Sequence, residues 1–168
     1  MTSEAIKLLR DELGHGLIDS CDFRGDETAL VARSEWRRAA DILRSKASFD
    51  MLVDLCAVDY PDREERFEVV AHLYSTELGK RVRIKARCTE ADPAIDSLCE
   101  VWRGANWFER EAYDLFGISF AGHPNLKRIL CHEGFQGHAL RKDYPKGRRG
   151  KIPHPQTLMD EMQREVEV

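Results

Sequence analysis

Charged residues stand among aromatic ones in residues 106–118, which read NWFEREAYDLFGI. The three acidic residues of this stretch, Glu109, Glu111 and Asp114, are of the type that performs general acid–base catalysis. On a helix, Glu111 and Asp114 are neighbours, whereas Glu109 points away from them. The sequence shows no serine or cysteine evidently paired with a histidine, and no glycine-rich phosphate loop after a strand. We therefore interpret these carboxylates as structural rather than catalytic.

A second group of residues has the chemistry of metal ligands: His123, Cys131, His132 and His138. Imidazole and thiolate are ligands that zinc prefers, so a free-standing zinc enzyme is one hypothesis for this protein. The spacing of the four residues matches none of the usual zinc patterns, and His123 precedes a proline in a turn-like context. We therefore predict that this chain binds no metal.

The five cysteines are spread singly along the chain, without a C-x-x-C pair. Zinc ribbons and iron–sulfur clusters need such short elements to bring thiolates onto one centre. We predict that the chain carries no cluster and no other cofactor. Cys56 and Cys88 lie in strand-like runs, where reduced cysteines pack as small hydrophobic residues.

The stretch from residue 106 to 118 has the signals of a helix that begins and ends within it. Asn106 can cap the first turn, and Glu109 can complete a capping box. Gly117 is placed to end the helix. Arg110 and Asp114 are expected to form an ion pair, because they lie four positions apart.

Apolar side chains cover a larger part of this predicted helix than is usual for a helix with one face in water. Glu111 falls at the edge of the apolar face, and a buried carboxylate there needs a cation or hydrogen-bond donors. Arg128, or the pair Arg141 and Lys142, can supply the charge. We therefore hypothesise a carboxylate–arginine network that shapes a surface covered by another protein. The apolar residues are Trp107, Phe108, Ala112, Tyr113, Leu115 and Phe116.

The sequence before this stretch predicts a two-layer α+β domain in which helices pack a mixed sheet. Apolar residues at helical spacing predict three helices, and alternating runs predict five strands, the first two as a hairpin. The last strand alternates three apolar residues with four basic ones, so one face is buried and the other faces water. The predicted helices are residues 3–14, 34–46 and 92–102. The predicted strands are residues 17–23, 28–33, 51–58, 67–75 and 81–87.

The character of the sequence changes after Gly104, where proline and glycine become frequent and periodicity weakens. We predict an α+β domain over residues 1–104, a motif-bearing helix with an extended partner-binding segment over 105–151, and a tail over 152–168. In the tail, Leu158, Met162 and Val166 recur every fourth position, which is typical of a one-sided docking helix.

Charge and hydropathy exclude two classes of partner. The net charge is −4, and the basic run over residues 140–151 lacks interleaved aromatics apart from Tyr144, so we predict no nucleic-acid partner. No apolar run approaches the ~18 residues of a membrane span. Charges also interrupt the apolar residues of the N-terminus, so no signal peptide is predicted and a cytoplasmic location follows.

Two stretches carry a resemblance to a known family. Residues 109–130 read EREAYDLFGISFAGHPNLKRIL, and residues 137–145 read GHALRKDYP. Both closely resemble the 30-kDa family of respiratory complex I, which in the bacterial NADH–quinone oxidoreductase is the C subunit. The α+β region before them agrees with that family's N-terminal domain in size and element order.

The resemblance implies a non-catalytic scaffold subunit in the peripheral arm of complex I, on the cytoplasmic side of a bacterial inner membrane. Its C-terminal segment would dock on the 49-kDa-type D subunit, which helps form the quinone site. FMN and iron–sulfur clusters are expected in other subunits. The assembled enzyme passes electrons from NADH to quinone and couples this to proton translocation.

The resemblance also implies which residues shape the scaffold and the interface, and the sequence departs from the family in three places. Ala139 stands where the family commonly has proline, and residues 130–133 (LCHE) differ from the usual threonine–aspartate continuation. Residues 146–155 (KGRRGKIPHP) are unlike the longer extension that many relatives carry, and the three departures concern the path of the tail. The scaffold and interface residues are Trp107, Glu109, Arg110, Glu111, Asp114, Gly117, His123, Pro124, Arg128, Arg141, Lys142, Asp143, Tyr144 and Pro145.

Two alternatives stand beside this interpretation. Energy-converting hydrogenases and ferredoxin or F420 dehydrogenases use a homologous subunit, and this sequence alone does not name the electron donor. The zinc enzyme that would use the His123 group is the alternative from a different functional class.

Overall fold

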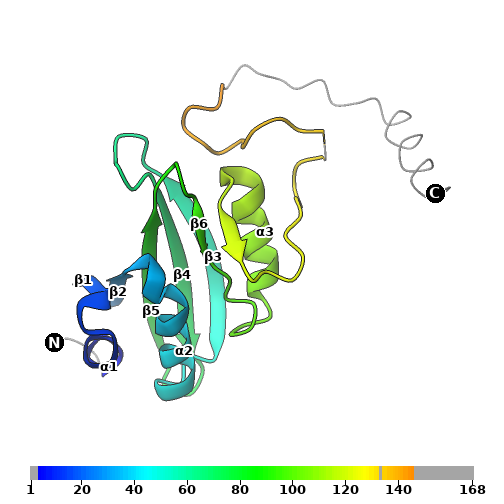
Figure 1. Cartoon of the computed structure of the whole chain (residues 1–168). Coiled ribbons are helices and arrows are strands. Elements are labelled where there is room, and N and C mark those ends of the chain that lie inside the picture. Colours follow the sequence, from blue (N-terminus) through cyan, green and yellow to red (C-terminus); the bar gives the residue numbers. More distant parts are fainter. Residues whose placement is uncertain (1–3, 133, 146–168) are drawn as a thin grey trace.

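A five-stranded sheet forms the centre of the computed structural model, which describes residues 4–132 and 134–145 (Figure 1). The strand order is β1-β2-β5-β4-β3, and β2 pairs with β5 in parallel while all other neighbours are antiparallel. The prediction of a mixed sheet is therefore confirmed. The strands are β1 (Leu17–Phe23), β2 (Asp26–Val31), β3 (Met51–Asp59), β4 (Phe67–Ser75) and β5 (Lys80–Cys88).

Three helices accompany this sheet and confirm the two-layer α+β architecture. Helices α1 (Glu4–Leu13) and α2 (Trp36–Lys46) contact each other and lie on one side of the sheet (Figure 1). Helix α3 (Ala105–Phe116) packs along β3, which is an edge strand. Short 3-10 turns, Gly14–Gly16 and Arg33–Glu35, precede β1 and α2.

The alternation along the strands places apolar side chains under the helices. Val82, Ile84 and Ala86 of β5 are buried, as predicted, against residues such as Leu9 of α1 and Trp36 of α2. Burying a side chain of the size of valine or leucine stabilises the fold by roughly 1.5–3 kcal/mol. Apolar packing therefore holds the two helices on the sheet.

The predicted helix over residues 92–102 is wrong. The segment forms the short strand β6 (Ala94–Asp96), which pairs in parallel with β7 (Ser119–Ala121). Its first half is bonded to the strand β7, where the Ser97 N–H donates to the Ala121 carbonyl at 2.8 Å, and only a single turn follows, in which the Trp102 N–H donates to the Leu98 carbonyl at 2.8 Å. Ile95 and Leu98 are buried at a spacing that imitates a helix.

The opposite face of the sheet is polar. Glu68 accepts from Lys85 at 2.8 Å and from Arg87 at 3.2 Å. Burial raises the pKa of Glu68, but these two cations outweigh it and lower that pKa overall. Part of the predicted basic row is thus neutralised within the sheet.

Two sequence predictions extend beyond this structure. The tail over residues 152–168, with its docking helix, lies outside the described residues, as does the last part of the basic run, from residue 146 onward. Within the described part, no helix combines the length and the apolar composition that crossing a membrane requires.

Candidate partner-binding site

Helix α3 begins and ends by different means. Gly104 precedes it without a side-chain cap, so the predicted capping box of Asn106 and Glu109 is wrong. At its other end Gly117 adopts φ 76°, and its N–H donates to the Tyr113 carbonyl at 2.9 Å. This left-handed termination confirms the prediction for Gly117.

The carboxylate of Glu109 is buried inside the chain. It accepts hydrogen bonds from Ser97 Oγ and from the Leu98 N–H, each at 2.6 Å, and Cys99 Sγ lies 3.4 Å away. Burial raises the pKa of Glu109. Glu109 therefore ties α3 to the segment after β6 and presents no charge at the surface.

Asp114 is the second buried acid of α3, and it fixes the chain that follows the helix. Its Oδ2 accepts the backbone N–H groups of Ile129, Leu130 and Cys131 at 2.8–3.0 Å, and its Oδ1 pairs with Arg128 Nη1 at 2.8 Å. Burial raises the pKa of Asp114, but these donors outweigh it and lower the pKa to about 2.

The predicted network exists, but its members differ from those expected. Arg128 pairs with Asp114 rather than with Glu111, which is exposed and has no ion pair among the described residues. Arg110 does not pair with Asp114; its guanidinium donates to the carbonyls of Lys127 and Arg128 at 3.1 and 3.3 Å. The predictions of a half-buried Glu111 and of an Arg110–Asp114 pair are therefore wrong, because the helix is rotated to bury Glu109 and Asp114.

The residues after α3 close over its C-terminal end. Arg128 Nη2 donates to the Gly137 carbonyl at 3.1 Å, and His138 Nδ1 donates to the Asp114 carbonyl at 2.9 Å. A Cβ on Gly117 would lie 2.5 Å from His138 Nε2 and 2.7 Å from Arg141 Nη2. Gly117 is thus required both for its left-handed backbone and for the close approach of this segment.

Residues 138–145, which we call the strap, are tied back to the sheet. Arg141 Nε donates to the Phe116 carbonyl at 2.6 Å, and the Lys142 N–H donates to Asp59 Oδ2 at 2.7 Å. The Asp143 carboxylate pairs with Arg66 at 2.8 Å. Three consecutive residues of the strap are therefore anchored at the C-terminal end of α3 and at the end of β3.

Arg66 is the centre of these anchors, and it is not among the residues predicted for the site. Its buried guanidinium contacts Asp59 at 2.7 Å, Glu90 at 2.7 Å and Asp143 at 2.8 Å. The hydrogen bonds that Arg66 donates, first to Asp59 and then to Asp143, raise the pKa of Arg66 and keep it charged. The opposite charges of Asp59 and Arg66 at the two ends of the β3–β4 loop were the available signal.

The remaining predicted residues have smaller roles. His123 Nε2 donates to the Asn106 carbonyl at 3.2 Å, and its Nδ1 accepts the Asn125 N–H at 3.0 Å, so both ring nitrogens are engaged. Tyr144 stacks on Phe135 with ring centroids 5.7 Å apart. Pro124 and Pro145 are exposed.

The proposed zinc quartet is not assembled in this part of the chain. Two groups of three or more metal donors occur within residues 4–132 and 134–145, and neither unites His123, Cys131, His132 and His138. His123 lies instead beside Cys99 and Glu109.

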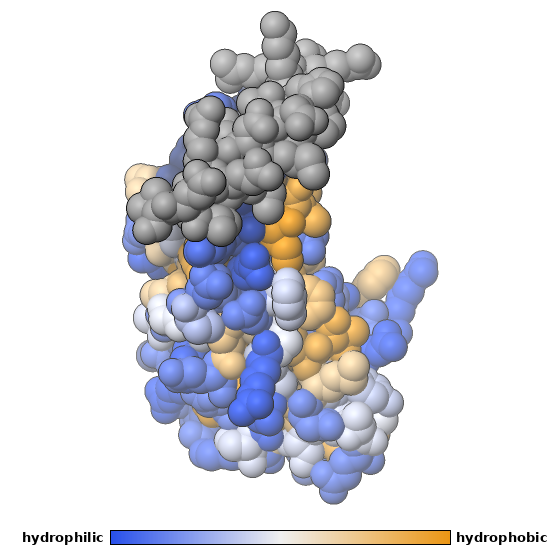
Figure 2. Space-filling model, turned by 90° about the vertical axis from the view of Figure 1, so that its right-hand side faces the viewer, coloured by the Kyte–Doolittle hydropathy of each residue, from blue (hydrophilic) through white to orange (hydrophobic). Residues whose placement is uncertain are grey.

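Large apolar side chains are exposed on α3 and on the segments bonded to it. The exposed fractions are 61% for Trp107, 63% for Leu130 and 50% for Leu140. The Leu130 N–H is bonded to Asp114, and the Leu140 N–H donates to the Leu115 carbonyl at 3.0 Å. Figure 2 shows apolar patches among hydrophilic residues on the face of the molecule that carries α3. We call Trp107, Leu130 and Leu140 the α3 surface.

Comparisons with known proteins show what this chain is similar to. A family model described as the 30-kDa subunit of the respiratory-chain NADH dehydrogenase matches residues 29–149. The C subunit of the NADH-quinone oxidoreductase of Citrifermentans bemidjiense is 43% identical over 143 residues, which cover 85% of this chain and 89% of that protein.

Two further relatives extend the comparison. The C/D subunit of the NADH-quinone oxidoreductase of Bdellovibrio bacteriovorus is 48% identical over 120 residues, which cover 71% of this chain and 21% of that protein. The solved structure of Nqo5, as its trypsin-resistant fragment (1–134), is similar with a TM-score of 0.61 and 33% identity, over 72% of this chain and 98% of that one. The chain belongs to the 30-kDa subunit family of the respiratory-chain NADH dehydrogenase.

Proposed function

We propose that this chain is a scaffold subunit of the peripheral arm of an NADH–quinone oxidoreductase and docks through the α3 surface and the strap onto a 49-kDa-type D subunit. In this function it holds no catalytic centre. FMN and iron–sulfur clusters belong to other subunits, and quinone binds at the neighbouring subunit. The assembled enzyme, on the cytoplasmic side of the inner membrane, couples electron transfer to proton translocation.

The observation that carries this proposal is an exposed apolar surface on a rigidly anchored backbone. Trp107, Leu130 and Leu140 are at least half exposed, yet Asp114 and Arg66 fix the segments around them through buried charges. Aromatic and aliphatic anchors held in place before binding lose little conformational entropy when a partner covers them. A lid over an active site would instead need freedom to move.

The C/D relative supports the choice of partner. Its name joins C and D in one protein, and this chain aligns with 21% of its length. A single protein that contains both parts keeps them close together, which favours a direct C–D contact in the two-chain form.

Co-purification tests the proposal. The tagged full-length chain is expected to retain a 49-kDa-type subunit, and the double variant Trp107→Ala with Leu130→Ala is expected to lose it. The loss of one hot-spot residue costs about 2 kcal/mol or more, so even if only one of the two is a hot spot the affinity should fall at least roughly 30-fold. Phe23→Ala is the matched control, because Phe23 is 68% exposed in β1 and lies outside the α3 surface.

Equal recovery of the D-type subunit with the double variant and with the control would contradict the proposed interface. The complex purified through the tagged chain is further expected to oxidise NADH when a quinone is supplied. Oxidation of another donor in its place would favour the related hydrogenase or ferredoxin-type complexes.

A further inference from the structure

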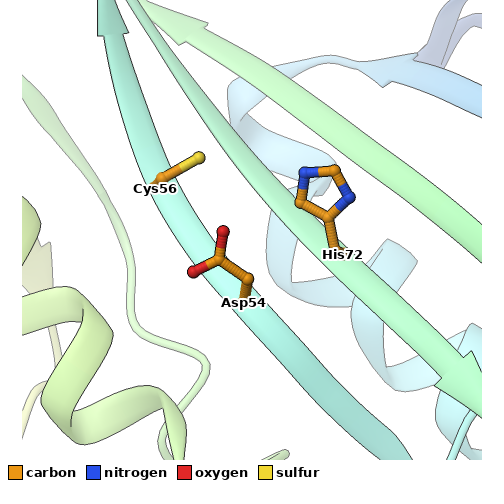
Figure 3. Close-up of side chains that lie close together, drawn as sticks. All are labelled: Asp54, Cys56 and His72. Atoms are coloured by element: carbon orange, nitrogen blue, oxygen red, sulfur yellow. The ribbon is translucent and has the colours of Figure 1, made fainter.

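A group of metal-binding side chains lies on the polar face of the sheet. Asp54 and Cys56 belong to β3 and His72 to β4 (Figure 3). Asp54 is the register partner of His72, and Cys56 lies two positions further along the same strand. One carboxylate oxygen, the sulfur and one imidazole nitrogen all lie within 4.8 Å of one another.

The backbone orients these donors. The pairing of β3 with β4 shifts register between Leu52 and Asp54, and from Asp54 onward the strands pair regularly. Residues two apart on a strand share a face, so the regular register holds Asp54 and Cys56 beside His72. All three side chains are only half buried, so an ion can reach them.

The charge of the group suits a divalent ion. Burial, and then the charge of Arg83, lowers the pKa of His72, which leaves its imidazole neutral with a free lone pair. The Cys56 thiol is a protonated group in the free protein, because burial and then Asp54 raise its pKa. A bound metal displaces that proton, and one thiolate with one carboxylate then balances two positive charges.

A neighbouring cation has a hydrogen-bond partner outside the group. Arg83 is the register partner of His72 on β5, and its Nη1 donates to Thr28 Oγ1 at 3.1 Å, while its charge still acts on His72. Two acidic residues, Asp26 near His72 and Glu111 near Cys56, add negative charge around the group and oppose the positive charges of Arg83 and Lys85.

A hollow adjoins Asp54 and His72, two of the three donors, and leaves room for another ligand. It has a volume of about 280 Å³, and its lining includes Asp54, His72, Arg81 and Arg83. Tetrahedral zinc has bonds of about 2.0–2.3 Å, which place its ligand atoms about 3.5 Å apart. Side-chain rotations that shorten the distances between the three donor atoms by about 1 Å would therefore complete the site.

The second donor group within the described residues is already engaged. Glu109 accepts from Ser97 and Leu98, and both ring nitrogens of His123 make hydrogen bonds. Among residues 4–132 and 134–145, the side chains of Asp54, Cys56 and His72 make no hydrogen bond to the backbone. We propose that Asp54, Cys56 and His72 form a binding site for a zinc-type divalent cation, with a fourth position open toward the hollow.

Metal titration of the full-length chain tests this site. Cobalt(II) is the probe, because a cysteine thiolate bound to it gives a near-ultraviolet charge-transfer band that other ligands do not give. One equivalent of cobalt should produce the band, and zinc should displace it. Cys56→Ser should abolish the band, and His72→Gln should weaken binding by more than the roughly 10–100-fold that loss of a supporting residue costs.

Two matched controls make the result specific. Cys21→Ser removes an exposed thiol, and Cys99→Ser removes the thiol of the second donor group; both should keep the band. Absence of binding by the unaltered chain, or a band that persists in Cys56→Ser, would overturn the site. The His72→Gln titration decides the matter if Cys56→Ser fails to fold. Co-purification of a D-type subunit is a separate readout, so this site and the proposed function fail independently.

Discussion

At the scale of single residues, Asp114 shows how one carboxylate can organise a segment without regular structure. Three consecutive backbone N–H groups and one guanidinium converge on it. The apolar and charged pattern of α3 predicts a carboxylate–arginine network here, but it favours Glu111 as the centre of that network. A helical wheel gives the relative angles of side chains, but it does not reveal which side the rest of the fold covers, and that side decides which acid is buried.

Asp114 should make the stability of the protein depend on pH. Its pKa in the folded state is about 2, below the ordinary 3.8, so its contribution is complete above about pH 5 and is lost as the pH falls toward 2. A difference of this size corresponds to about 2 kcal/mol. The Asp114→Asn variant should therefore be less stable than the unaltered chain at about pH 6. This difference in unfolding free energy, the deficit, should shrink by about 1–2 kcal/mol when the pH is lowered to about 2.5.

Urea unfolding at the two pH values measures this change. Asp62→Asn serves as the control, since Asp62 is an exposed acid in the β3–β4 loop, and it should show no deficit at either pH. Amide exchange at Ile129, Leu130 and Cys131 should also be faster in Asp114→Asn. A deficit that stays constant with pH would contradict the assignment.

At the scale of elements, periodicity predicted what is locally determined. The predicted helices over residues 3–14 and 34–46 and the five predicted strands correspond to α1, α2 and β1–β5, because their buried faces repeat at the period of the element. The segment over residues 92–102 was mistaken for a helix because β6 depends on β7, which lies beyond α3 in the chain. Pairing between segments so far apart leaves no local pattern.

Gly117, at the end of α3, can be compared with Gly79, which lies in the turn between β4 and β5. Gly117 and Gly79 both have positive φ, 76° and 63°, but a Cβ would meet neighbours only at Gly117. Gly79→Ala should cost roughly 1–2 kcal/mol, the strain of a left-handed residue. Gly117→Ala should cost at least about 1 kcal/mol more, because His138 and Arg141 must move. Chemical denaturation of both variants measures the difference, and equal costs would show that this close packing is not important.

At the scale of the whole molecule, buried charges join the strap to the sheet. Arg66 contacts Asp59 and Asp143 through a planar fork, a geometry that lysine does not reproduce. Arg66→Lys should therefore lower the free energy of local opening of the strap by about 1 kcal/mol. Tryptic cleavage after Arg141 or Lys142 should then be roughly 5–10-fold faster.

Arg37→Lys is the control for this cleavage assay. Arg37 pairs with Glu100 at 2.7 Å on the surface, away from the strap, so this variant should be cleaved in the strap at the rate of the unaltered chain. Equal rates in Arg66→Lys and Arg37→Lys would show that the fork does not hold the strap. The sequence predicts Arg141, Lys142 and Asp143 as interface residues, but it does not indicate the buried arginine to which the strap is bound. Contacts between residues 66 and 143 depend on the strand order, which periodicity does not encode.

The parallel contact between β2 and β5 has a consequence for synthesis on the ribosome. Strands β3, β4 and β5 follow one another through short loops and can pair as they emerge, whereas β2 is made early and meets its partner only when β5 is complete. During that interval the backbone of β2 presents an unpaired edge, to which a foreign strand could add. The nascent chain is therefore most exposed to misassociation, and has most need of a chaperone, between the translation of Val31 and that of Cys88.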